Sequence, residues 1–344
     1  MRIIQENISG SMFRSRILEE YFTPRHTVVA DIETTGLSPR GSQVILGGLV
    51  VRDGENRLAV QYFADDPEDE AELLDRYAGM LIQYPVIVTY NGNSFDLPFI
   101  RKRMALHRLD VSGLQRYVSF DLYRILKKYS GLSAILPDLK QKTVERYLGI
   151  GQTRRDTIDG AESVRLYSQY LRSSGRNREG LLDTILLHNR DDIVKLSEIM
   201  SALRYLDLHE IMYHEGFPVF QEKNRAVIRR ILAGNRGVSI EGTVSGDPEP
   251  YRGFERGTDA ELSADGDFSI RIPVETVGGY SVADLKALDT DLPQLQELAG
   301  YESGYLILRD PEKNIQYHEV NRLARQLTIR LLGELTFSQQ LLPG

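Results

Sequence analysis

The sequence predicts an α/β protein in which helices flank a mixed sheet and a smaller β-rich domain follows. Apolar runs with the length of strands alternate with helical patterns up to about residue 204. After about Gly234 the pattern changes to short alternating segments separated by turn residues. A length of 344 residues fits two domains, each able to bury its own core.

The first domain begins with strands and continues with alternating helices and strands. The first three strands are expected to be antiparallel, with Asp53-Gly54 as the hairpin turn between the second and the third. The first strand should lie centrally in the sheet, and several helices should follow the last strand. The expected elements are strands 27–32, 43–52 and 57–63, helix 68–82, strand 86–90, helix 97–108 and strand 117–120.

Four segments follow from this pattern. They are an N-terminal extension at 1–24, the α/β domain at 25–205, a helical connector at 206–233 and a β-rich accessory domain at 234–344 that ends in a helix. The expected elements of the accessory domain are strands Val238–Val244 and Phe268–Val274, a hairpin of Tyr305–Arg309 with Tyr317–Val320, and a closing helix Asn321–Glu334.

Two carboxylates stand at the end of the first predicted strand. Asp31 and Glu33 are two residues apart, so they project from the same face of the strand. Two acids this close repel each other unless a cation lies between them, and hard divalent metals take oxygen ligands of this kind. The alternative is a solvent-facing pair of acids at a strand end.

A third acid stands at a junction between a strand and a helix. Asp96 follows the buried strand at 86–90 and the turn Asn91-Gly92, and it precedes Pro98 in the first turn of a helix. Ligands and catalytic groups concentrate at such junctions in α/β sheets. The alternative is that Asp96 only caps the helix.

The third motif lies on a late helix. His188 and Asp192 are one helical turn apart on one face, whereas Asp191 points roughly 60° away from the direction of His188. Apolar residues recur at helical spacing around them and predict that this helix packs on the sheet. Taken singly, His188 and Asp192 would be interpreted as structural and surface residues.

Together and in this order, the three segments resemble the DEDD superfamily of 3′→5′ exonucleases. The matching residues are Asp-x-Glu-Thr-Thr-Gly from Asp31, Asn-x-x-x-Phe-Asp-x-Pro from Asn91, and His188 followed by Asp192. The region from about Arg25 to Tyr205 resembles the YprB-like group of ribonuclease-H-like nucleases. His188 precedes Asp192 by the spacing typical of members that have a tyrosine at this position.

The resemblance implies a metal-dependent 3′→5′ exonuclease. Asp31, Glu33, Asp96 and Asp192 would hold two divalent ions, Mg²⁺ or Mn²⁺, about 3.5–4 Å apart, and His188 would be the general base. The substrate would be a single-stranded 3′ end of DNA or RNA. Residues expected to contact it are Thr34, Asn91, Phe95, Lys140 and Lys142. The alternative is a non-catalytic nucleic-acid-binding or adaptor module that keeps the fold.

Charge and composition set limits on these hypotheses. The formal net charge is −7, but residues 97–155 contain 13 Lys/Arg and 4 Asp/Glu, with tyrosines interleaved as in a groove for nucleic acid. The chain has no cysteine, which excludes disulfides and thiolate zinc sites. No apolar run is long enough to span a bilayer, so we expect a cytoplasmic protein without membrane contact. The accessory domain could bind substrate, contact a protein partner or brace the first domain.

Overall fold

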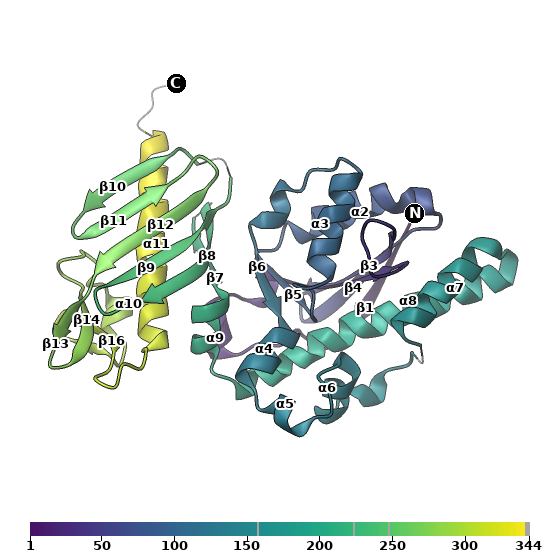
Figure 1. Ribbon diagram of the computed structural model, residues 1–344, viewed down its shortest axis with the longest axis horizontal. Helices are drawn as coiled ribbons and strands as arrows, with labels where there is room; N and C mark the ends of the chain where they lie inside the picture. The colour runs from purple at the N-terminus through teal and green to yellow at the C-terminus, as the bar shows by residue number, and fades with distance from the viewer. Residues whose placement is uncertain (157, 223, 247, 341–344) are drawn as a thin grey trace. The chain divides into compact units, whose positions relative to one another are not determined.

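The computed structural model describes residues 1–156, 158–222, 224–246 and 248–340 (Figure 1). The chain divides into two compact units, Met1–Leu206 and Asp207–Gly344. Among the described residues, no helix combines the length and the apolar character needed to cross a membrane.

The first unit is built on a mixed sheet of six strands. Their order is β1-β4-β3-β2-β5-β6. β2 pairs antiparallel with β3 and parallel with β5, so the expected central position of this strand is confirmed. The strands are β1 (Arg2–Ile8), β2 (Thr27–Thr34), β3 (Val44–Asp53), β4 (Asn56–Phe63), β5 (Val86–Thr89) and β6 (Val118–Asp121).

Helices cover both faces of this sheet, as Figure 1 shows. Apolar side chains of α2 and α3 share a core with Val28, Ala30 and Ile32 of β2. On the other face, α7 and α8 pack against Ile45, Leu46 and Phe63. The helices of this unit are α1 (Arg16–Glu19), α2 (Glu70–Leu81), α3 (Asp96–Leu106), α4 (Leu122–Tyr129), α5 (Leu132–Ile135), α6 (Gln141–Tyr147), α7 (Gly160–Arg172) and α8 (Gly175–Ile199).

The expectation that residues 1–24 form an extension is wrong. β1 pairs with β4 along its whole length and makes the edge of the sheet, and the amino group of Met1 lies 2.7 Å from Asp69. Most side chains of an edge strand face solvent, and Glu6 and Asn7 are exposed here. The segment therefore lacks the apolar alternation by which a strand is found in a sequence.

The second unit contains two antiparallel sheets and a long helix. The first sheet has the order β10-β11-β12-β9-β8-β7 and the second the order β13-β14-β16-β15. Its elements are α9 (Leu208–Glu215), β7 (Phe217–Gln221), β8 (Asn224–Ala233), β9 (Gly237–Val244), β10 (Tyr251–Glu255), β11 (Thr258–Leu262), β12 (Asp267–Pro273), β13 (Glu275–Val277), β14 (Tyr280–Asp284), α10 (Pro293–Gln296), β15 (Tyr301–Glu302), β16 (Tyr305–Arg309) and α11 (Tyr317–Gln340).

Residues 206–233 are not a helical connector. Among the described residues of this segment only α9 is helical, and β7 and β8 are strands of the first sheet of the unit. Gly216 ends α9 at φ +84°, and a Cβ there would lie 2.2 Å from the carbonyl oxygen of Ile228. The run Ala226-Val227-Ile228 is apolar without alternation, a pattern that a buried strand shares with a buried helix.

The expected hairpin with Tyr317–Val320 is also wrong, because these residues begin α11. Buried residues at Val320, Leu323, Ala324 and Leu327 continue one helical stripe, so the helix starts four residues before the expected Asn321. β16 pairs with β14 and β15 instead.

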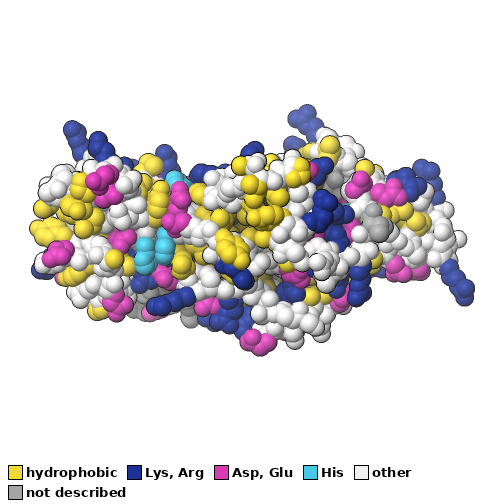
Figure 2. All heavy atoms as spheres, turned by 90° about the horizontal axis from the view of Figure 1, so that it is seen from below, with side chains coloured by type: hydrophobic (Ala, Val, Ile, Leu, Met, Phe, Trp, Pro, Cys, Tyr) yellow, Lys and Arg dark blue, Asp and Glu magenta, His cyan; other side chains and the backbone are white. Residues whose placement is uncertain are grey.

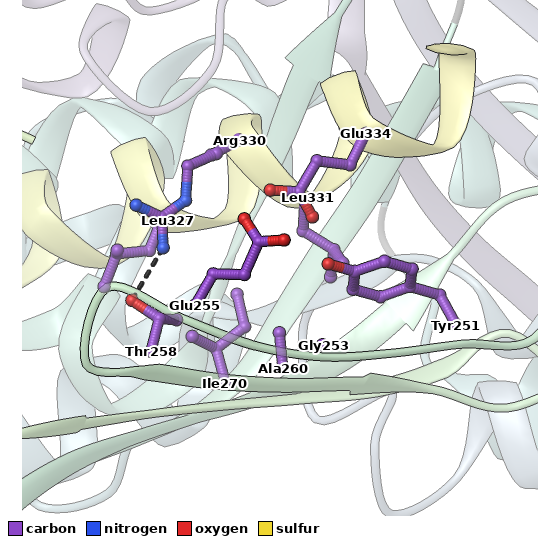
Figure 3. A pocket seen from close by; sticks show the side chains of 10 residues that line it. All are labelled: Tyr251, Gly253, Glu255, Thr258, Ala260, Ile270, Leu327, Arg330, Leu331 and Glu334. Carbon is purple, nitrogen blue, oxygen red and sulfur yellow. Dashed lines mark hydrogen bonds between the residues drawn. The ribbon is translucent and has the colours of Figure 1, made fainter. Parts of the chain in front are cut away.

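Figure 3 shows how α11 lies over the first sheet of the second unit. Leu327 and Leu331 point from the helix toward Ala260 and Ile270 on the strands, and Arg330 donates a hydrogen bond to Oγ1 of Thr258 at 2.6 Å. The small hollow between them is part of the packing of this helix on its sheet.

Candidate active site

β2 aims two carboxylates toward α8. Since Val28, Ala30 and Ile32 enter the core beneath α2 and α3, strand alternation turns Asp31 and Glu33 to the opposite face of the sheet. Glu33 is 7% exposed and Asp31 is half-buried. The carboxylates therefore project from one strand into the space that α8 covers.

Asp96 joins them through the backbone of β2. Pairing between β2 and β5 stops at Val29, so the N–H of Ile32 lies beyond the ladder and donates to Oδ1 of Asp96 at 3.1 Å. Asp96 is the first residue of α3, and the N-cap residue is Phe95. The side chain of Asp96 thus bonds to the backbone of β2 between Asp31 and Glu33. The interpretation of Asp96 as a simple helix cap is wrong.

The loop before α3 is held by a second aspartate. Asp121, at the end of β6, accepts hydrogen bonds from the N–H groups of Asn91 at 2.8 Å and Asn93 at 3.1 Å. Asn91 has φ +65°, and Gly92 lies so close to Thr89 that a Cβ would be 2.5 Å from it. These contacts set the direction in which the chain enters α3 and presents Asp96.

α8 brings the histidine and the fourth carboxylate. His188 is 3% exposed, with Nε2 3.5 Å from Oε1 of Glu33 and 3.5 Å from Oδ2 of Asp192. The neighbouring Asn189 is fully buried, and its Nδ2 donates to Oδ2 of Asp31 at 3.0 Å. One turn of helix therefore reaches both carboxylates of β2.

The four carboxyl groups influence each other strongly. Burial, followed by the charges of Asp96, Asp192 and Glu33, raises the pKa of Asp31 well above its ordinary value. Burial raises the pKa of both Glu33 and Asp96 to about 7, and it also raises the pKa of Asp192. Burial alone would lower the pKa of His188, but its carboxylate neighbours outweigh burial and raise that pKa. The site therefore holds an excess of buried acidic groups that repel one another when they are ionised.

This donor set fits divalent cations. Glu33, His188 and Asp192 offer ligand atoms that all lie within 4.8 Å of one another. Asp31, Asp96 and Asp192 each use one carboxylate oxygen for a protein donor, namely Asn189, the N–H of Ile32 and Arg154. Oxygen-rich, mutually repelling ligands are those that Mg²⁺ and Mn²⁺ bind.

The sequence did not reveal the segment at 154–156 as part of the site. Asp156 Oδ2 lies 2.8 Å from Nδ1 of His188, and Arg154 donates to Oδ1 of Asp192 at 2.6 Å. Arg154 also bonds to Oε1 of Glu145 at 2.7 Å. The one available signal was an Arg-Arg-Asp triplet after a basic helix, which looks the same as a solvated loop.

Asp191 supports this segment from α8. It is fully buried, and its Oδ2 accepts the N–H groups of Arg155 at 2.5 Å and Asp156 at 2.9 Å. Its Oδ1 accepts a hydrogen bond from Arg190 at 2.8 Å. Asp191 faces away from the carboxylate cluster, as the helical spacing predicts.

The residues expected to contact substrate lie in different environments. Asn91 and Lys140 are exposed, and Phe95 is half-buried, with its ring centroid 5.4 Å from that of Phe99. Thr34 is buried and donates its hydroxyl hydrogen to the carbonyl oxygen of Gly36 at 2.8 Å. The ammonium of Lys142 lies 3.0 Å from Asp156. Thr34 and Lys142 therefore make internal contacts.

The basic region at 97–155 is spread over several elements. Lys127 lies over the ring of Tyr123 and Lys128 over that of Tyr129, whereas Tyr117 is buried in the core and is not available to stack on a base. On the face shown in Figure 2, Lys and Arg side chains are interspersed with Asp and Glu. This face does not show one continuous basic groove.

Comparison with known proteins identifies the family. A model of the RNase_H superfamily matches residues 28–204, slightly more than half of the chain, and the chain belongs to this superfamily. The expected fold class, a ribonuclease-H-like sheet flanked by helices with a β-rich C-terminal region, is confirmed.

This chain spans less than half of the length of each relative described here. "Uncharacterized protein YprB" of Bacillus subtilis is 29% identical over 171 residues, which are 48% of this chain and 39% of that protein. "DNA polymerase 1" of Saccharolobus solfataricus is 27% identical over 160 residues, 41% of this chain and 18% of the polymerase. The solved structure of the family B DNA polymerase of Pyrobaculum calidifontis is 18% identical and superposes with a TM-score of 0.40. The match covers 52% of this chain and 25% of the polymerase chain. The similarity to YprB bears out the resemblance found in the sequence.

Proposed function

We propose that this member of the RNase_H superfamily is a metal-dependent 3′→5′ exonuclease that hydrolyses phosphodiester bonds at single-stranded 3′ ends. One observation carries the proposal: four carboxylates from three distant segments lie in one cluster, and a buried histidine faces two of them, Glu33 and Asp192. The four carboxylates are those of Asp31 and Glu33 of β2, Asp96 of α3 and Asp192 of α8. A structural role does not explain why a protein would keep so many like charges together out of water.

The carboxylates have the character of ligands for two divalent ions. Asp31, Glu33, Asp96 and Asp192 would hold them through their carboxylate oxygens. Bound Mg²⁺ or Mn²⁺ would supply Lewis acidity, which activates water and neutralises charge on the phosphate. Asn189 fixes one oxygen of Asp31 and the N–H of Ile32 fixes one oxygen of Asp96, so these ligands are oriented before any cation binds.

We assign His188 the role of general base. Its Nε2 faces Glu33 and Asp192, and Nδ1 faces Asp156 on the other side of the ring. A water molecule between the carboxylates would give its proton to Nε2 as its oxygen attacks phosphorus, and the bond to the 3′ oxygen of the leaving chain breaks. Asn91, Phe95 and Lys140 are exposed enough to contact the nucleic acid, and we assign them this role.

The test is incubation of the full chain with 5′-labelled single-stranded DNA and RNA in Mn²⁺ or Mg²⁺. A ladder of shortening labelled products that EDTA prevents would support the activity, its polarity and the sugar preference together. Release of labelled mononucleotide as the first product would contradict the polarity. Binding without any cleavage in either metal would favour the non-catalytic nucleic-acid-binding module instead.

A further inference from the structure

The ring of His188 is held on its far side by a buried aspartate. Asp156 Oδ2 lies 2.8 Å from Nδ1 of His188, within good hydrogen-bond distance, and the side chain of Asp156 is 1% exposed. By contrast, Nε2 lies 3.5 Å from both Glu33 and Asp192. The close contact of the ring is therefore with Asp156, and the looser side faces the carboxylate cluster.

Asp156 is itself fixed by several donors. Arg154 donates to its Oδ1 at 2.5 Å, and the ammonium of Lys142 donates to its Oδ2 at 3.0 Å. The backbone N–H of Asp156 is bound to Asp191 on α8, three residues from His188 in the same helix. Both the side chain and the backbone of Asp156 are thus anchored, so it offers His188 a rigid acceptor.

The chemistry of the pair decides which nitrogen carries hydrogen. A neutral imidazole has one N–H donor and one acceptor nitrogen, and a carboxylate can only accept. Burial would raise the pKa of Asp156, but its bonds with His188, Arg154 and Lys142 outweigh burial and lower it, so Asp156 is ionised. Nδ1 must then carry the hydrogen, which leaves the lone pair of Nε2 toward Glu33 and Asp192.

We propose that Asp156 is a positioning residue, which fixes the rotation and the tautomer of His188 so that Nε2 can accept a proton in the carboxylate cluster. The inference rests on the proposed nuclease function for its consequence, although the arrangement of the pair can be measured without it. Without Asp156 the ring can take the other tautomer, in which an Nε2–H faces Glu33 and Asp192 and cannot accept a proton.

The first experiment measures the tautomer directly in the metal-free protein, at a pH above the raised pKa of His188, where the ring is neutral. Two-dimensional ¹H–¹⁵N spectra of the imidazole groups distinguish Nδ1–H from Nε2–H, and His188→Ala identifies the signals of His188 among the six histidines. We expect the Nδ1–H form in the parent protein and an increased share of Nε2–H in Asp156→Ala. The same tautomer in both proteins would overturn the proposal, whether or not the protein proves to be a nuclease.

The second experiment separates positioning from folding in the metal-loaded protein. Asp156→Ala should lower kcat roughly 10- to 100-fold with little change in KM, the usual scale for residues that orient a ligand or base. Asp156→Asn, which keeps an oxygen to accept from Nδ1, should lose less. Asp159→Ala is the matched control, because Asp159 lies three residues further on and caps α7 through the N–H of Glu162.

The outcomes are distinct. If the parent protein cleaves and Asp156→Ala retains the kcat of Asp159→Ala, the positioning role is wrong although the proposed function stands. If Asp156→Ala does not fold, the kinetics and the imidazole spectrum of Asp156→Asn decide in its place. If the parent protein does not cleave at all, the proposed function fails and the imidazole spectra alone decide whether Asp156 sets the tautomer.

Discussion

Because its carboxylates are crowded together, we expect the site to lower the free energy of unfolding of the metal-free protein. Burial raises the pKa of Glu33 from 4.5 to about 7, so the ionised form is disfavoured in the folded state. This difference corresponds to about 3 kcal/mol once both states are ionised. The folded protein holds the proton more tightly than the unfolded chain, so the contribution is absent below about pH 4.5 and stability falls as pH rises through the window from about 4.5 to 7.

Glu33→Gln removes this charge at nearly constant volume. Because glutamine also changes the contact with Nε2 of His188, we expect a net gain in the free energy of unfolding of about 2 kcal/mol at pH 8 and little gain near pH 4.5. The assay is urea denaturation of metal-free protein in EDTA at both pH values. Glu55→Gln makes the same chemical change at an exposed position of the β3–β4 hairpin and serves as the control.

Metal gives the second arm of this test. Mn²⁺ should stabilise the parent protein by mass action, whereas Glu33→Gln should gain less because it has lost an oxygen ligand. A Glu33→Gln variant that is less stable than the parent protein at pH 8 in EDTA would refute the reasoning. So would a gain of the same size at pH 4.5, because the effect would then not come from ionisation.

Three further changes test the assignments of individual residues. Asp96→Ala should abolish cleavage of labelled oligonucleotide while nucleic-acid binding falls much less, and near-normal turnover would contradict its role as a ligand. Asp192→Ala should remove activity with little loss of stability. Asp191→Ala should instead lower the free energy of unfolding in urea by about 3 kcal/mol, because two N–H groups and an arginine lose a buried acceptor. Equal activity losses in the two variants, together with equal free energies of unfolding, would refute these separate roles. Glu70→Gln should lower the free energy of unfolding by about 3 kcal/mol at pH 7, because Arg103 then lacks its buried partner. Although burial acts to raise the pKa of Glu70, its hydrogen bonds lower it overall, so this cost should shrink as pH falls below about 4.5, and a cost independent of pH would argue against the ion pair.

The sequence predicts those parts of the site that depend on local geometry. Alternation along β2 places Asp31 and Glu33 on one face, and the turn before α3 places Asp96 at the junction with β5. These inferences need only the pleat of a strand and the conformation of a short loop. The central position of β2 follows in the same way, since its apolar run has few polar residues and both faces are covered.

The parts that sequence could not predict depend on contacts between distant residues. Asp156 belongs to no regular element, and its role arises because α8 passes beside it and Asp191 binds its backbone. β1 carries mostly exposed side chains, so its membership in the sheet is recorded in backbone hydrogen bonds with β4 and not in its apolar pattern. Lys142 looked like a residue for binding phosphate, but a buried carboxylate lies within its reach.

One turn of α8 explains why a histidine can stand four residues before the last aspartate. Each residue advances about 100° around the helix, so Asp192 lies about 40° from His188 and shares its face. Asn189 turns to Asp31, and Asp191, about 60° to the other side, turns to the backbone of Asp156. The same turn therefore presents the base, orients one carboxylate and anchors the aspartate that contacts the base. A shift of one residue would send Asp192 to the face that Asp191 occupies, so the spacing and the segment that carries Asp156 depend on each other.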